Sequence, residues 1–352
     1  NLNKLLIRIL LHLQVEFSIY TKIKNPRFRA MGMLLLHLLR RKYTCMSFDP
    51  VLGCNLKCRM CYFSDEAKRR EMHGVFSDRD VAAIARSIFP YVLKLQIGCG
   101  AEPTVYNKLD EVVKLGKLYG IGYISMTTNG NLLNLVKLRQ LVASGLDEIT
   151  ISLHGIKRET YEYFMEGGNF SKFKQLVEAL RQIKIEQRNF KVRVNYTVNE
   201  DNIEDLKYFK DMFDGVVDIL QIRPIQKIGN SDYSNYSMKK VIENYDDCIK
   251  PLVEYCHQNG IVCIFPSLDN IRALSNGCKN TETDNTNALV DMIPYFYLSP
   301  YDGWMKKINP YEENLYDYFR REGRLKQLLG FVFTPKSMRK HGVTKSLNYN
   351  VD

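Results

Sequence analysis

The sequence lacks the features that would place it among repeat proteins or small secreted domains. It has no internal repeat and no low-complexity segment, and its nine cysteines are an odd number spread over 352 residues. They do not form the dense, regular framework of a disulfide-stabilised secreted domain. A reducing compartment suits such a chain, so we expect a cytoplasmic protein with enough apolar residues, 45%, to fold by itself.

The chain also lacks an uninterrupted hydrophobic run at its beginning. The leucine-rich segment 1–24 contains Lys4, Arg8 and Glu16, which make it too polar to span a bilayer. No small-residue cleavage site follows it. We therefore expect neither a transmembrane helix nor a targeting segment in this part of the chain.

Residues 2–23 and 31–42 are predicted to form two apolar helices, separated by Asn25-Pro26 because proline interrupts a helix. The favoured interpretation is a cap that packs on the rest of the protein or on a partner. The alternative is an interfacial element, peripheral at the inner membrane surface, with Arg40, Arg41 and Lys42 facing acidic lipid.

The formal net charge of +11 favours anionic partners such as nucleic acid, acidic lipid or a phosphorylated substrate. However, the basic residues are spread along the chain, apart from the short runs 40–42 and 68–70. No RNA-binding signature accompanies them, so a solvated basic surface is the favoured interpretation and nucleic acid is not an expected partner.

From Tyr43 onward, short apolar runs alternate with longer helical patterns, which is typical of repeated βα units. The fold predicted is α/β, a partial (β/α)6 TIM-like barrel spanning residues 43–270. Residues 1–42 form an N-terminal helical extension and 271–352 a small C-terminal extension with a basic tail. The predicted strands are 45–50, 93–98, 123–128, 148–153, 191–198 and 217–222, with a further apolar run at 261–265.

Cys54, Cys58 and Cys61 stand in a CxxxCxxC spacing directly after the first predicted strand. Closed zinc sites and ordinary iron-sulfur clusters use four protein ligands, so three thiols suggest a metal centre with one open position. The flanking Lys57 and Arg59 are expected to favour the thiolate form.

Three further motifs follow the next three predicted strands: Gly98-Cys99-Gly100-Ala101-Glu102-Pro103, Thr127-Thr128-Asn129-Gly130 and Ser152-Leu153-His154-Gly155. In a barrel of parallel strands these segments meet at the carboxyl-end face, where active sites lie. We expect them to surround the cysteines.

The order and spacing of these motifs resemble the radical S-adenosylmethionine (SAM) superfamily. The resemblance is to the branch with molybdenum-cofactor biosynthesis protein A, sulfatase-maturing and peptide-modifying enzymes. It implies that Cys54, Cys58 and Cys61 hold one 4Fe-4S cluster whose fourth iron is chelated by the methionine part of SAM. It further implies a reductive cleavage that yields a 5′-deoxyadenosyl radical, and hydrogen abstraction from a peptide, protein or small biosynthetic intermediate. A reducing donor such as flavodoxin or ferredoxin would be the electron-transfer partner.

The resemblance also implies which residues contact SAM. The carbonyl groups of Gly100 and Ala101 and the Glu102 carboxylate would accept the protons of its ammonium group. The other contacts expected are Thr128 and Asn129 at the third strand end and Ser152, a donor to the SAM carboxylate.

The chain departs from the family pattern at three places. Ala101 replaces a glycine, which costs little unless its φ is positive. His154 replaces an acid, and it either enters the substrate pocket or bonds a neighbour. Many relatives have an arginine for the SAM carboxylate where this chain has Met165 and Glu166, so Arg193 either substitutes for it or forms an ordinary ion pair. Arg223 is open to the same two interpretations.

Four late cysteines, at 248, 256, 263 and 278, lack the spacing expected for a second cluster. We expect a degenerate remnant of an auxiliary-cluster domain without a cluster. The alternative to an enzyme is a non-catalytic iron-sulfur or zinc protein that binds RNA or acidic lipid.

Overall fold

The computed structural model describes residues 25–226, 230–233, 235–275, 294–333 and 349–351. The helix predicted over 2–23 and Cys278 lie outside the described residues. None of the helices in the described ranges has the length and apolarity needed to cross a membrane.

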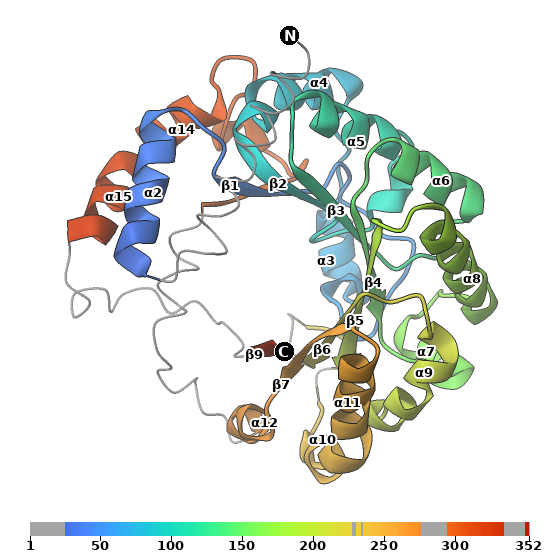
Figure 1. The fold of residues 1–352 in the computed structure, drawn as a ribbon. Helices are drawn as coiled ribbons and strands as arrows, with labels where there is room; N and C mark the ends of the chain where they lie inside the picture. The colour runs from blue at the N-terminus through green and yellow to red at the C-terminus, as the bar shows by residue number, and fades with distance from the viewer. Residues whose placement is uncertain (1–24, 227–229, 234, 276–293, 334–348, 352) are drawn as a thin grey trace.

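The core is one curved sheet with the strand order β8-β1-β2-β3-β4-β5-β6-β7-β9 (Figure 1). Strands β1 to β8 are parallel to their neighbours, and β9 pairs antiparallel with β7. The strands are β1 (Thr44–Phe48), β2 (Val92–Ile97), β3 (Tyr123–Thr128), β4 (Glu148–Leu153), β5 (Lys191–Val198), β6 (Ile219–Pro224), β7 (Val262–Pro266), β8 (Tyr295–Leu298) and β9 (Tyr349–Val351). The prediction of an α/β partial barrel is confirmed.

The convex side of the sheet is covered by helices (Figure 1). These are α4 (Asp78–Ser87), α5 (Leu109–Leu118), α6 (Leu135–Ala143), α7 (Arg158–Phe164), α8 (Phe170–Glu186), α9 (Phe209–Phe213), α10 (Lys239–Glu243), α11 (Lys250–Gln258) and α12 (Leu268–Ser275). Alternate residues of the strands β2 to β6 are apolar and buried, as Leu95 and Ile97 are in β2. The residues between them, such as Lys94 and Gln96, face the concave side and line a cavity there.

The sheet is larger than the six strands predicted, because the C-terminal region returns to it. Strand β8 pairs in parallel with β1, with Cys45 opposite Tyr295 and Phe48 opposite Leu298. Residues assigned to a C-terminal extension therefore provide an edge strand of the same sheet. No local pattern joins two strands that are about 250 residues apart in the sequence, so this pairing is a property of the tertiary structure.

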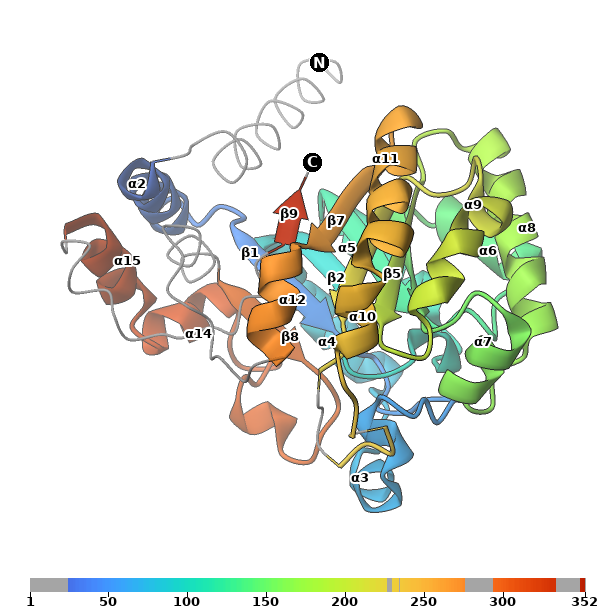
Figure 2. The same cartoon turned by 90° about the horizontal axis from the view of Figure 1, so that it is seen from below.

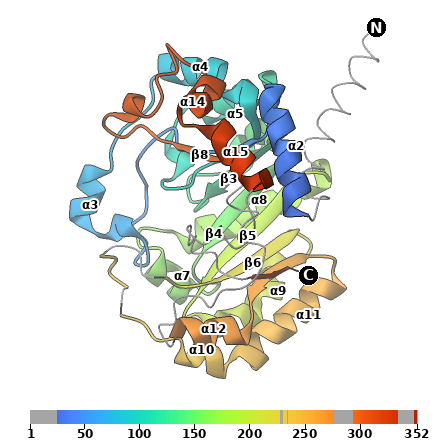
Figure 3. The same ribbon diagram turned by 90° about the vertical axis from the view of Figure 1, so that its left-hand side faces the viewer.

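Helix α2 (Pro26–Leu38) begins after Asn25, whose side chain accepts from the amide of Arg27. It therefore starts earlier than the predicted range 31–42. It lies beside α15 (Arg324–Phe333), which follows α14 (Leu315–Arg321), on the side of the molecule away from α3 (Glu66–Glu71) (Figures 2 and 3).

One face of α2 is packed and the other is exposed. Ala30, Met33 and Leu36 are buried, as the cap interpretation requires. The opposite face exposes apolar side chains, namely Phe28, Met31, Leu35, Leu38 and Leu39. Contact with acidic lipid through this face therefore stays a prediction.

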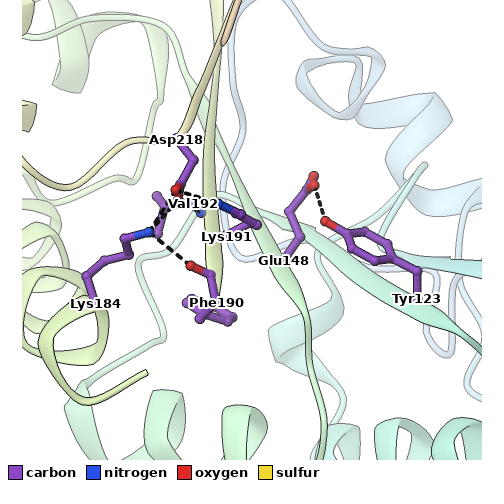
Figure 4. A network of polar contacts seen from close by, with 7 residues as sticks. All are labelled: Tyr123, Glu148, Lys184, Phe190, Lys191, Val192 and Asp218. Carbon is purple, nitrogen blue, oxygen red and sulfur yellow. Dashed lines mark hydrogen bonds and ion pairs between the residues drawn. The ribbon is translucent and has the colours of Figure 1, made fainter. Parts of the chain in front are cut away.

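Two aspartates fix the amino-terminal ends of neighbouring strands in the same way. Asp147, just before β4, accepts from the Ile124 amide at 2.7 Å and from Lys117 at 2.6 Å. Asp218, just before β6, accepts from the Val192 amide at 2.8 Å and from Lys184 at 2.8 Å (Figure 4). Each carboxylate thus joins the start of its own strand to the start of the preceding strand and to the helix that leads into that preceding strand.

The carboxylate of Asp218 gives a test of this arrangement. Burial alone would raise its pKa, but hydrogen bonds from Lys184, the Val192 amide and Lys191 lower the pKa below its usual value. We expect Asp218→Asn to lower the free energy of unfolding at pH 7 by about 1 to 3 kcal/mol, because charge-assisted bonds are lost.

The difference should be present above the ordinary aspartate pKa and should shrink as the pH falls through the lowered one, where the wild-type carboxylate is also neutral. Urea unfolding of both variants at pH 7 and at about pH 2, below the lowered pKa, measures it. The exposed Asp211→Asn serves as the control, and equal effects of the two substitutions would contradict the assignment.

Candidate functional site

The three cysteines lie on a loop that follows β1 at the carboxyl-end edge of the sheet. Arg69 of α3 holds this loop, because its guanidinium donates to the carbonyl oxygens of Cys54 (3.0 Å) and Leu56 (3.1 Å). From the other side, the Lys57 amide donates to the carbonyl of Glu166 at 2.9 Å. The loop is thus fixed in place by protein contacts alone.

Cys54, Cys58 and Cys61 are close enough to influence one another. Burial raises the pKa of the Cys54 thiol to about 11 and raises that of Cys61. The pKa of Cys58 is raised first by burial and then by the neighbouring Cys54, Cys61 and Glu102. The structure therefore brings the three thiols and Glu102 together, as the sequence predicted.

The expectation that Lys57 and Arg59 favour the thiolates is wrong. Lys57 forms an ion pair with Glu66. Arg59 donates to the Tyr163 carbonyl at 2.9 Å and lies 3.4 Å from the Glu166 carboxylate. Both side chains are thus used in bonds away from the thiols, whose deprotonation must accompany metal binding.

The thiols are not arranged around a single ion. Among the described residues, no group of three or more His, Cys, Asp or Glu side chains is placed to hold one metal ion. An iron-sulfur cluster does not need its ligands around one ion, because its thiolate ligands bind different irons. Three partly buried thiols that lie near one another fit such a cluster.

Glu102 joins the ends of β2 and β3. One carboxylate oxygen, Oε1, accepts from the Thr104 amide (3.1 Å), the Thr104 hydroxyl (2.5 Å) and the Thr128 hydroxyl (2.6 Å). The other, Oε2, accepts from the Asn129 amide at 2.8 Å. Because a carboxylate offers about four acceptor positions, Oε2 keeps room for a second donor. The predicted contact with an ammonium group is compatible with this geometry.

Asn129 connects Glu102 to the cysteine loop. Its side-chain amide donates to Asn55 Oδ1 at 2.9 Å and lies 3.8 Å from Cys54 Sγ. The Thr128 hydroxyl donates to Glu102 and so supports that carboxylate, and its contact with SAM stays a prediction.

The loop 98–103 is shaped by Asp49, which the sequence analysis missed. Its carboxylate accepts from the amides of Cys99 (2.7 Å) and Gly100 (2.8 Å) and from the hydroxyl of Tyr297 in β8 (2.8 Å). A Cβ atom at Gly100 would lie 3.1 Å from the hydroxyls of Tyr62 and Tyr297, so only glycine fits easily. An acid directly after the first strand was the available signal.

Ala101 is accommodated as expected. Among the described residues, the only non-glycine with positive φ is Arg40. The backbone at Ala101 therefore carries no left-handed strain, and the exchange of glycine for alanine costs little. The Gly100 carbonyl is already in use, because it accepts from the Tyr62 hydroxyl.

The carboxyl ends of β4 and β5 are joined by two further residues that the sequence analysis missed. Asn202 donates to the carbonyls of His154 (2.9 Å) and Thr197 (2.8 Å). The buried Asp205 accepts from the amides of Ile156 (2.9 Å) and Lys157 (3.1 Å). No short motif marks this role, because the partners on the β4 side, His154, Ile156 and Lys157, are 48 or 49 residues away in the sequence.

His154 is held without a bond at one ring nitrogen. Its Nδ1 is buried and has no hydrogen-bond partner in the described part of the chain. Burial lowers its pKa to about 4, so the ring is neutral at pH 7. The interpretation that it bonds a neighbour is not supported at Nδ1.

Ser152, Arg193 and Arg223 all line the concave cavity, but at different depths. Arg193 lies near the start of β5 and pairs with Glu148 at 2.9 Å, so the ion-pair interpretation holds for it. Arg223 lies near the end of β6, opposite Thr197. It is thus the cation nearer the cysteine edge, and a role for Arg193 at the SAM carboxylate remains only a prediction.

Three of the late cysteines, 248, 256 and 263, are buried. Cys256 is hydrogen-bonded to Cys263, which lowers the Cys256 pKa. Trp304, which lies in the predicted C-terminal extension 271–352, packs edge-on against Phe76, with ring centroids 4.8 Å apart. These residues thus serve packing in the described structure, and the absence of an auxiliary cluster stays a prediction.

Comparison with known proteins finds a family model that matches part of this chain. Residues 49–213 match the sequence model of the Radical SAM superfamily. A probable GTP 3′,8-cyclase of Saccharolobus islandicus is 26% identical over 54% of this chain and 61% of its own length. The corresponding Saccharolobus solfataricus protein is 28% identical over 58% and 66%. The match thus spans only about three fifths of the length of these relatives.

Solved structures show the same fold. Streptococcus suis SuiB bound to the precursor peptide SuiA has a TM-score of 0.54 and 16% identity, over 82% of this chain and 67% of that chain. SuiB bound to S-adenosylmethionine has a TM-score of 0.56 and 15% identity, over 83% and 69%. With the family match and the cysteine loop at the carboxyl-end edge, residues 49–213 form a radical SAM domain.

Proposed function

We propose that this protein is a radical SAM enzyme with one 4Fe-4S cluster held by Cys54, Cys58 and Cys61. The observation that carries the proposal is that three partly buried thiols lie near one another and near Glu102 at the carboxyl-end edge of the sheet. When bound and reduced, the cofactor pair would supply a 5′-deoxyadenosyl radical for hydrogen abstraction. The chain's residues position the reactants and exclude water.

Each part of the site has a proposed task. Glu102 Oε2 and the carbonyl of Ala101 accept protons from the SAM ammonium group, and Asn129 holds the cysteine loop to the Glu102 loop. Ser152 faces the cavity and is placed to donate to a carboxylate. Met60, which is buried, covers the cysteine loop from the side of Asn199.

The substrate is proposed at the level of a peptide, a protein or a small biosynthetic intermediate. The relatives are named as acting on GTP, and SuiB has been seen with a precursor peptide. A reducing donor such as flavodoxin or ferredoxin completes the proposal.

The ligand assignment predicts distinct effects for two cysteines of the site. Cys58→Ala should lose nearly all cluster iron and all dithionite-dependent 5′-deoxyadenosine, because one of the three ligands is removed. Cys99→Ala should keep the wild-type iron content, because Cys99 is bonded to Ser47 and is no ligand. Anaerobic reconstitution with iron and sulfide analysis measures both. Loss of iron from Cys99→Ala would contradict the three-ligand assignment, and a wild-type protein that binds metal without cleaving SAM would favour the non-catalytic alternative.

A second prediction concerns Glu102. Glu102→Gln replaces an acceptor oxygen by an amide donor that faces other donors, so we expect SAM to bind at least about tenfold more weakly, about 1.4 kcal/mol. The cluster should still assemble. Calorimetry with SAM measures the change, and the exposed Glu111→Gln is the matched control. Unchanged affinity in Glu102→Gln would show that this carboxylate is not part of the SAM site.

We also propose peripheral contact with acidic lipid through the exposed face of α2. The apolar side chains of that face are flanked by the exposed Arg27, Arg40 and Arg41, which suits an anionic surface. Wild-type protein should co-sediment with vesicles containing phosphatidylserine and much less with pure phosphatidylcholine. Leu35→Glu should reduce this binding, whereas equal sedimentation of the variant would contradict the proposal.

A further inference from the structure

The concave side of the sheet encloses a cavity of about 390 Å³ that is lined from β2, β3, β4, β5, β6 and β8. This volume falls in the range of small-molecule sites. Closed barrels of the TIM type fill the same space with layers of branched apolar side chains. Here the lining residues are mainly polar or charged, for example Gln96, Thr150, Asn195 and Gln221. The interior is therefore a hydrophilic lumen and not a packed core.

The charges of this lumen are predominantly positive. Lys94, Arg193 and Arg223 line it together with a single carboxylate, that of Glu148. Glu148 is already paired with Arg193 at 2.9 Å and accepts from the Tyr123 hydroxyl at 2.7 Å (Figure 4). A concave surface with surplus cations concentrates anions.

Arg223 is the cation with the greatest freedom to bind a ligand. Its side chain is exposed, and within the described ranges it has neither an ion pair nor a hydrogen bond. By strand register it lies opposite Thr197, near the carboxyl-end edge. Deeper in the lumen, Asn195 Oδ1 is buried and has no hydrogen-bond partner among the described residues. A polar ligand would satisfy both groups.

We propose that the lumen binds a small, hydrophilic substrate with an anionic group, a carboxylate or a phosphate, that pairs with Arg223. A guanidinium matches either group with two parallel hydrogen bonds. The ion pair of Arg193 with Glu148 forms the floor, so the ligand enters from the cysteine edge. This inference rests on the proposed function, because it names the substrate class of the same site, and it disfavours an apolar substrate.

The test uses inorganic phosphate and succinate as anionic probes and glycerol as a neutral probe, titrated by calorimetry into anaerobically reconstituted protein. We expect wild type to bind at least one anion and not glycerol. Arg223→Gln should weaken that binding at least tenfold, because the pairing cation is lost. Arg223→Lys should recover part of the anion binding. The positive charge is kept, but the two parallel N–H donors of the guanidinium are lost. The exposed Arg188→Gln is the matched control and should bind like wild type.

Preference for phosphate or for succinate identifies the source of the anionic group, and either result supports the proposal. Equal binding by wild type and Arg223→Gln, or no anion binding by wild type, would overturn it. Displacement of the anion by saturating SAM would also overturn it, because Arg223 would then belong to the cofactor. Iron content and 5′-deoxyadenosine are measured on the same protein, so failure of the proposed function is seen separately from failure of anion binding.

Discussion

The alternation of apolar and polar side chains along the parallel strands is the constraint on which the rest of the structure depends. Strand β5 shows it, with Val192, Val194 and Tyr196 buried beneath the helices and Arg193 and Asn195 lining the lumen. The apolar face provides the core that holds the helices. If the polar residues of the concave face packed against one another, some of their polar groups would lack hydrogen-bond partners. The concave face of the open barrel therefore lines a cavity.

Buried carboxylates at the strand ends convert that open sheet into a defined site. Asp49 shapes the loop after β2, Glu102 joins the ends of β2 and β3, and Asp205 holds the loop after β4. Each accepts from backbone amides, which are charge-assisted bonds that fix loops more firmly than neutral ones. The cysteine loop is then held by Asn129 and Arg69, so the position of the thiols depends on contacts from several parts of the sheet.

The sequence predicted the cysteine edge of the sheet well because its signals are local. The strands 123–128, 148–153 and 191–198 have the predicted limits, since each is bounded by turn residues and an amphipathic helix. The motifs after the first four strands met at one edge for the geometric reason that parallel strands end there. The prediction for Lys57 and Arg59 was wrong because sequence neighbours need not be spatial neighbours, and both side chains reach carboxylates and carbonyls elsewhere.

By itself, the sequence determined the α/β class, the cysteine triad and the order of the motifs, because periodicity and spacing act over a few residues. Only the tertiary structure decided that β8 joins β1, that Asp49 and Asp205 organise the site, and that Arg193 and Arg223 lie at different depths of the lumen. These outcomes depend on strand register and on contacts between residues far apart in the chain. Such contacts form only when the whole sheet curves around its polar face.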